Sequence, residues 1–202
     1  MLLRLISFLS PVLLAVIIPF LLATIPEPKP LTRKIIPPTI ALLTLLLILA
    51  AVSIISGGIG FTGFLKLSIF IIAYSVMITA FTLMLLSFNL AGIIVQVIVT
   101  LPLLLMSSAI FYVNPLIELS AGAARQSIIQ CSINLNPILI IGADFFNYDM
   151  ILAPQMYKIS FIQYYPHNYP EWHYVTGIYL FAALISFIIL RIRMRFLSDK
   201  AG

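Results

Sequence analysis

Charged residues are scarce in this chain. Only 8% of its 202 residues are Asp, Glu, Lys or Arg, whereas 62% are hydrophobic. An ordinary soluble domain has about a quarter of its residues charged, and it needs polar groups to cover its surface. The mean hydropathy of +1.18 leads to the same conclusion. The composition therefore excludes a soluble globular domain and indicates that a lipid bilayer surrounds most of the chain.

Formal charges are absent from four long stretches, at residues 5–26, 35–65, 67–117 and 172–190. A helix that crosses a bilayer needs about 20 mostly apolar residues. We therefore expect an all-α, polytopic integral membrane protein with about five transmembrane helices, folded as one domain over residues 1–202. The expected spans are 5–24, 37–56, 64–86, 90–113 and 175–190.

Residues 114–174, between the last two expected spans, differ from the rest. Six of the nine tyrosines lie between Tyr148 and Tyr174, together with the single tryptophan. Tyr and Trp favour the headgroup level of a bilayer, so we expect an external region of short interfacial or re-entrant helices, broken at Asn136-Pro137. Its candidate contacts for a partner or a solute are Tyr164, Tyr165, Tyr169 and Trp172. The alternative is that these aromatics only anchor the chain in the membrane.

Basic residues flank the apolar runs and set the expected topology. Arg191, Arg193 and Arg195 follow the last span and are expected to anchor it from the cytoplasm. With five spans the N-terminus is then outside. A six-span alternative makes 126–147 a crossing helix, and the charge count does not separate the two. Because that helix would place several polar side chains in the bilayer, at a cost, the sequence favours five spans.

The connector at 25–34 contains three alternating prolines, which disfavour helix. We expect it to be extended. Pro37 and Pro38 suit the first turn of the second span, where backbone amides lack helical partners in any case.

Motifs for chemistry are also missing. The lone Cys131 cannot form an intramolecular disulfide, and His167 and His173 lack the spacing of a helical metal pair. No charged residue falls in the middle of an expected span, where a proton or ion path would need one. The letters at 58–63 match G-x-G-x-x-G, but they lie between two membrane spans, without the parallel strand or the acidic residue of a dinucleotide site. We therefore expect no enzyme, cofactor, metal or nucleic-acid partner.

The second half resembles the type-2 permeases of ATP-binding cassette exporters. The resembling stretches are 101–108, 135–138 and 145–157, within 65–196: a helical hairpin, an external segment with Asn136-Pro137, and a last span with a basic tail. The resemblance implies a permease that works with a separate ATPase, since the chain has no Walker motif. The first half departs from the family: one N-terminal span is missing, and the short 25–34 loop is the only candidate for docking an ATPase.

Two functions remain open from the sequence. The first is a permease-like transporter subunit in a bacterial or archaeal inner membrane, with membrane partners such as an ATPase or a second copy of the chain. The alternative is a non-catalytic accessory or structural subunit of a larger respiratory or photosynthetic complex. The lack of charged groups and motifs in the spans is typical of such subunits.

Overall fold

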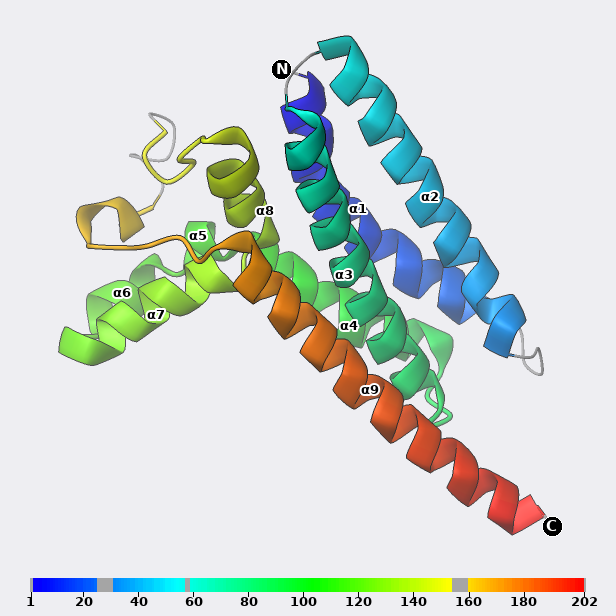
Figure 1. Ribbon diagram of the computed structural model, residues 1–202. Coiled ribbons are helices and arrows are strands. Elements are labelled where there is room, and N and C mark those ends of the chain that lie inside the picture. The colour runs from blue at the N-terminus through cyan, green and yellow to red at the C-terminus, as the bar shows by residue number, and fades with distance from the viewer. Residues whose placement is uncertain (1, 25–30, 57–58, 154–159, 202) are drawn as a thin grey trace.

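The computed structural model describes residues 2–24, 31–56, 59–153 and 160–201, and these contain helices but no strand. A bundle is formed by α1 (Leu2–Thr24), α2 (Leu31–Ser56), α3 (Phe61–Leu86), α4 (Gly92–Ser107) and α9 (Trp172–Ala201) (Figure 1). All of these except α4 are long and apolar enough to cross a bilayer. The chain is therefore an all-α polytopic membrane protein, as predicted. Most of the expected extended connector, at 25–30, lies outside the described residues.

Short helices connect α4 to α9. They are α5 (Ala109–Tyr112), α6 (Asn114–Leu119), α7 (Gly122–Asn134), α8 (Pro137–Ile140), the π-helix η1 (Ile141–Phe145) and the 3₁₀ helix η3 (Ile162–Tyr164). The helices over 122–145 form an apolar pair bent by 71°, which we call the re-entrant pair. The bend falls at the Asn136-Pro137 step, where Pro137 lacks an amide donor and the Asn136 side chain caps α8.

The directions of the long helices favour five spans over six. Tyr74 of α3 packs on Tyr179 of α9 with ring centroids 5.2 Å apart, and further along the same helices Arg193 lies 5.5 Å from the Phe88 ring. The two helices are thus parallel, so the chain must recross the bundle an odd number of times between them. α4 does so once. The re-entrant pair therefore enters and leaves on one side.

Prolines in α1 show how the bundle replaces lost helical bonds. Pro19 cannot donate to the carbonyl of Ala15, and the Thr100 hydroxyl of α4 donates to that carbonyl instead, at 3.0 Å. Pro11 likewise leaves the carbonyl of Ser7, which accepts from the Ser10 hydroxyl at 2.7 Å. The first of these bonds ties α1 to α4. Gly92, at the start of α4, lies against Ala23 near the end of α1, so the two helices are antiparallel.

The largest differences from the predicted helix boundaries are in α4, α2 and α9. The fourth helix stops at Ser107 instead of continuing to residue 113. Two causes act together: Pro102 interrupts the helical bonding, and the hydroxyls of Ser107 and Ser108 bond back to the carbonyls of Leu103 and Leu104. The fourth helix is therefore about 24 Å long, shorter than the about 30 Å hydrocarbon core.

The second and last helices begin or end beyond the expected span. α2 starts at Leu31, so Pro37 and Pro38 lie inside it and not in its first turn, and residues 31–34 are helical where an extended connector was expected. The free-energy cost of placing these two prolines inside the helix is small. The carbonyls that lose an amide donor lie near the helix end, where water can reach them. α9 continues to Ala201, since neither Gly nor Pro follows the arginines closely enough to end it.

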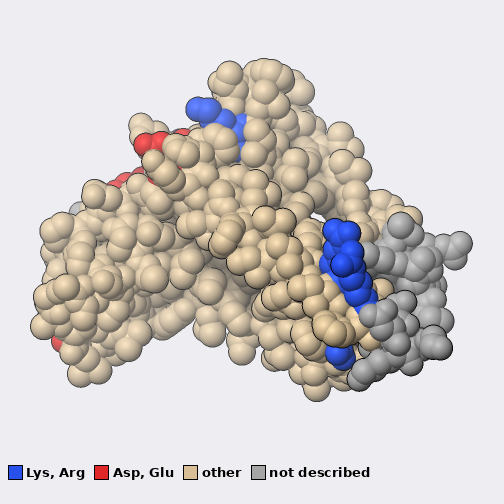
Figure 2. Space-filling view, turned by 60° about the horizontal axis from the view of Figure 1, so that its bottom comes forward, with Lys and Arg blue, Asp and Glu red and all other residues tan. Residues whose placement is uncertain are grey.

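The two ends of the bundle carry different charges. The end where α1, α3 and α9 begin also holds α5 to η3, and we call it the re-entrant end; the other is the C-terminal end. Arg4 and Lys66 share the re-entrant end with Asp144 and Glu171. Figure 2 shows acidic and basic side chains close together on one part of the surface, and a separate group of basic side chains with no described acidic side chain beside it.

The spacing of polar residues along α3 and α9 matches a bilayer. From Lys66 to Ser87 the chain advances about 31 Å, and from Trp172 to Arg191 about 28 Å. Both values are close to the about 30 Å thickness of a hydrocarbon core. These spacings are compatible with one membrane surface near Lys66 and Trp172 and the other near Ser87 and Arg191.

Candidate functional site: an apolar cavity between α3, α4 and α9

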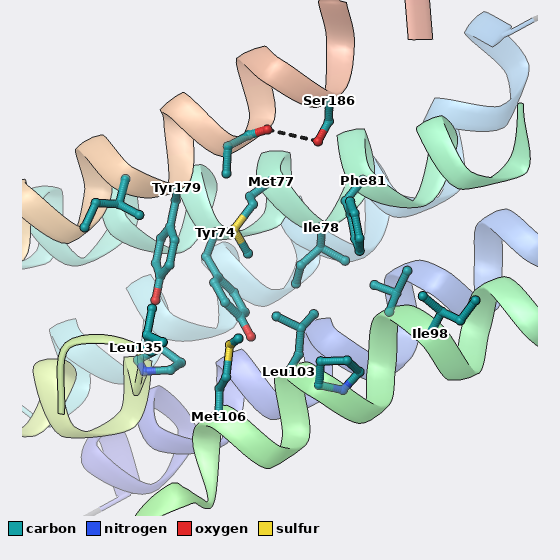
Figure 3. A pocket seen from close by; sticks show the side chains of 15 residues that line it. Tyr74, Met77, Ile78, Phe81, Ile98, Leu103, Met106, Leu135, Tyr179 and Ser186 are labelled. Atoms are coloured by element: carbon teal, nitrogen blue, oxygen red, sulfur yellow. Dashed lines mark hydrogen bonds between the residues drawn. The ribbon is translucent and has the colours of Figure 1, made fainter. Parts of the chain in front are cut away.

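A cavity of about 480 Å³ lies between α3, α4, α9 and the re-entrant pair (Figure 3). Its volume falls within the range of small-molecule pockets, roughly 300–1,000 Å³. The lining is almost wholly apolar. It comprises Tyr74, Met77, Ile78 and Phe81 of α3, Ile98, Val99, Pro102, Leu103 and Met106 of α4, Leu135 and Pro137 of the re-entrant pair, and Ile178, Tyr179, Ala182 and Ser186 of α9.

Helix packing explains why this space is left open. α9 packs along α3, while α4 packs mainly on α1. The contact with α1 is close, because a Cβ placed on Gly92 would lie only 2.8 Å from the carbonyl oxygen of Ala23. α4 is thereby held toward α1 and away from α9. The side chains between α4 and α9 do not fill the resulting gap.

Two phenols are the main polar groups of the cavity wall. Tyr74 is 2% exposed and Tyr179 is 5% exposed, and neither hydroxyl has a hydrogen-bond partner among the described residues. Ser107 is the polar side chain nearest to the Tyr74 hydroxyl, and its own hydroxyl donates to the Leu103 carbonyl at 2.9 Å. A buried polar group without a partner costs about 1–3 kcal/mol. Two such groups on one apolar wall require an explanation.

Asn136 closes the cavity at the re-entrant end. It is fully buried, and its side-chain amide donates to the carbonyl of Ser107 at 2.9 Å. Its side-chain oxygen accepts from the backbone amides of Ile138 and Leu139 at 3.0 and 3.3 Å. One side chain thus caps α8 and joins the re-entrant pair to the end of α4. It also fixes Leu135 and Pro137 at the cavity wall.

The four aromatic residues singled out from the sequence do not form one surface. The guanidinium carbon of Arg125 lies 5.2 Å from the centroid of the Tyr165 ring. The Tyr169 hydroxyl donates a hydrogen bond to Asp149. Trp172 packs on Phe145, with ring centroids 6.1 Å apart. Tyr164, in contrast, is 66% exposed. Three of the four therefore hold the region together from within, and only Tyr164 is freely presented.

Arg125 organises much of this region. Its Nε donates to the carbonyls of Ile117 and Ser120 at 3.0 and 2.9 Å, and its Nη1 donates to the Tyr165 hydroxyl at 3.3 Å. Ile117 lies in the last turn of α6 and Ser120 directly follows it, where carbonyls lack helical partners. A cation there also complements the helix dipole. Arg125 therefore joins α6, α7 and the segment before α9.

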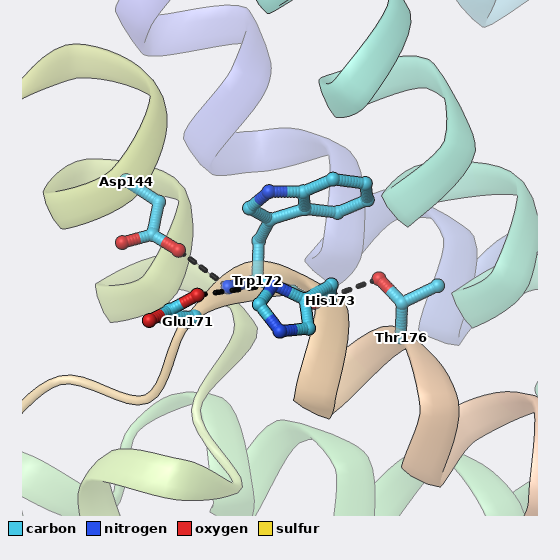
Figure 4. Close-up of polar contacts among 5 residues, drawn as sticks. All are labelled: Asp144, Glu171, Trp172, His173 and Thr176. Carbon is cyan, nitrogen blue, oxygen red and sulfur yellow. Dashed lines mark hydrogen bonds and ion pairs between the residues drawn. The ribbon is translucent and has the colours of Figure 1, made fainter.

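Asp144 marks the start of α9. Its carboxylate accepts from the backbone amide of Trp172, and Glu171 pairs with His173 at 3.2 Å (Figure 4). Burial raises the pKa of the Asp144 carboxyl above its usual range, and the Trp172 amide acts to lower it. A carboxylate suits this place because the N-terminus of a helix attracts negative charge. Among the described residues, no group of three or more His, Cys, Asp or Glu side chains could hold a metal.

Sequence reasoning drew attention to the external aromatics and missed the cavity. The available signal was the position of Tyr74 and Tyr179, which fall inside expected spans and not at their ends. Tyrosine usually marks the interface, so two tyrosines deep in spans indicate polar contacts within the bundle. No family model, curated protein or solved structure matches the chain.

Proposed function

We propose that the chain is the membrane-embedded, permease-like subunit of a transporter that moves an apolar solute and works with a separate ATPase. The observation that supports this is the cavity, an apolar space within the bundle bounded by the broken re-entrant pair. Irregular backbone at membrane depth is tolerated where it lines a cavity. In this proposal the ATPase is another chain, because the sequence contains no Walker motif.

Co-purification tests this proposal. The tagged chain is extracted from its native membrane in a mild detergent, and its stoichiometric partners are identified by mass spectrometry. We expect an ATPase, and we expect the reconstituted assembly to hydrolyse ATP. The same preparation shows whether a second copy of the chain is present. Recovery without any ATPase would remove the transporter proposal.

The alternative, an accessory subunit of a larger membrane complex, is favoured by the exposure of α2. Its residues Leu47, Ile54 and Ile55 are 70%, 84% and 85% exposed. Such a face suits lipid or the helices of neighbouring subunits. Recovery of large redox subunits in the same experiment would support the alternative.

For orientation, we propose that the C-terminus lies in the cytoplasm and the N-terminus outside, in a bacterial or archaeal inner membrane. The basic residues Arg191, Arg193 and Arg195 at the C-terminal end favour this orientation. Asn89, in the turn between α3 and α4, and Asn168, before α9, are exposed and lie at opposite ends of the bundle.

Cysteine labelling measures this orientation. In a Cys131→Ser background, which removes the exposed native thiol, Asn168→Cys is expected to react with an impermeant maleimide on intact cells. Asn89→Cys is expected to react only after the membrane is opened. The reverse pattern would invert the topology, and labelling of both from one side would contradict the five-span arrangement.

A further inference from the structure

The two unpaired phenols define which apolar molecule the cavity can accept. Tyr74 comes from α3 and Tyr179 from α9, and Figure 3 shows both pointing away from their helices toward α4 and Leu135. Their rings pack at 58° to each other, 5.2 Å apart, which fixes both rings against rotation into other positions. Two donors that lack partners and border one cavity can bind an acceptor atom there once the side chains that cover them move.

Depth in the membrane restricts the ligand further. Tyr74 lies about 12 Å along α3 from Lys66, and Tyr179 about 10 Å along α9 from Trp172. The Cα atoms of both tyrosines therefore lie inside the hydrocarbon core, in the half nearer the re-entrant end. The ester oxygens of ordinary phospholipids stay near the headgroups and do not reach this level without drawing the headgroup into the core, which is costly. The acceptor oxygen must belong to a molecule that is apolar on both sides of it.

A partner helix is a poor source for that oxygen. Its backbone carbonyls are already bonded within the helix, so it would fill the cavity with apolar side chains and leave both hydroxyls unpaired. Charged ligands are disfavoured as well, because the cavity wall contains no ionised side chain to balance them.

We infer that the cavity binds a neutral, long-chain apolar molecule with an internal acceptor oxygen, such as a ketone, ester or ether, and that the Tyr74 and Tyr179 hydroxyls donate to this oxygen. This inference rests on the proposed function, because it takes the cavity as the place where the solute binds. Neighbouring side chains cover both hydroxyls. Met106 and Leu135, at the phenol ends of the wall, are the flexible side chains that the ligand displaces.

The test compares two probes on the purified chain in detergent. One is a radiolabelled dialkyl ketone with a mid-chain carbonyl, and the other is the alkane of the same length; both affinities are corrected for partition into micelles. We expect the ketone to bind roughly tenfold more tightly than the alkane, which corresponds to about one net hydrogen bond. Equal affinities, or no binding of either probe, would overturn the inference.

Substitutions then assign the preference to the two hydroxyls. Tyr74→Phe with Tyr179→Phe keeps the rings and the cavity volume, so we expect the alkane to bind as before and the ketone to lose its advantage. Tyr164→Phe, at the exposed tyrosine outside the cavity, is the control and should keep the preference. A double variant that still prefers the ketone would show that other groups bind the oxygen.

Thermal unfolding without ligand gives a second test. In it the double variant, which should lose ketone binding, is expected to keep or gain thermal stability. Because the variant removes donors that have no partner, it should melt at or above the wild-type temperature. A lower melting temperature would mean that the hydroxyls are already satisfied, for instance by water, and would contradict the inference.

The binding assay needs no ATPase. Ketone preference without a co-purifying ATPase would support this binding site and contradict the transporter proposal. A co-purifying ATPase without ketone preference would support the transporter proposal and contradict this site.

Discussion

Replacing Asn136 with alanine is expected to detach the re-entrant pair from α4 and to lower the melting temperature of the purified protein by roughly 6–12 °C. The substitution removes the cap of α8, which contributes about 1 kcal/mol. It also leaves the buried carbonyl of Ser107 without a donor, at a cost of about 2 kcal/mol. The helix offers no replacement, because the amide of Phe111 already donates to Ser108.

Asn134→Ala is the matched control. Asn134 ends α7 only two residues earlier, and its side chain accepts one bond from Gln130, within the same helix. Surface changes of this kind usually stay within about 0.5 kcal/mol. Hydrogen exchange should show loss of protection across 122–145 in Asn136→Ala and not in Asn134→Ala. If Asn136→Ala melted like wild type with this segment still protected, the side chain would not be the link between the re-entrant pair and α4.

The sequence was sufficient for the membrane class because composition alone decides it. Charge-free runs such as 67–117 have no stable place outside a bilayer. The break at Asn136-Pro137 was also predictable, since a capping side chain followed by proline at the first helical position is a local signal. These features depend on neighbouring residues only, and they need no knowledge of the tertiary packing.

Features that depend on partners distant in sequence could not be predicted in this way. The cavity exists because Gly92 brings α4 against Ala23, 69 positions earlier, while α9 packs on α3. The carbonyl of Ser107, at the end of α4, accepts from Asn136, which lies 29 residues away in the sequence. The external tyrosines were equally ambiguous, because anchoring in the membrane and packing on Arg125 require the same aromatic character.

The packing of the external region leads to the second large effect. Arg125→Ala removes the guanidinium donor to the Ser120 carbonyl and to the Tyr165 hydroxyl, and one of the two side-chain donors to the Ile117 carbonyl, the other being the Ser120 hydroxyl. It also removes the guanidinium that covers the Tyr165 ring, a contact that contributes about 0.5–1 kcal/mol where it is partly exposed. Because the site is only partly buried, water compensates some of the loss, and we expect a total of about 2 kcal/mol.

Conservative variants separate the contributions. Arg125→Lys keeps the charge but cannot direct donors to three acceptors at once, so it should fall between wild type and alanine. Tyr165→Phe keeps the ring under the guanidinium and loses only the 3.3 Å bond, so its effect should be small. Hydrogen exchange at α6, α7 and η3 is the measurement. Because these contacts are separate from the cavity wall, the ketone preference should survive in Arg125→Lys even where exchange at α6 becomes faster. If Arg125→Lys lost both the ketone preference and the exchange protection of α6, the region over α5 to η3 and the cavity would be energetically coupled. Unchanged hydrogen exchange in Arg125→Ala would contradict the role assigned to this residue.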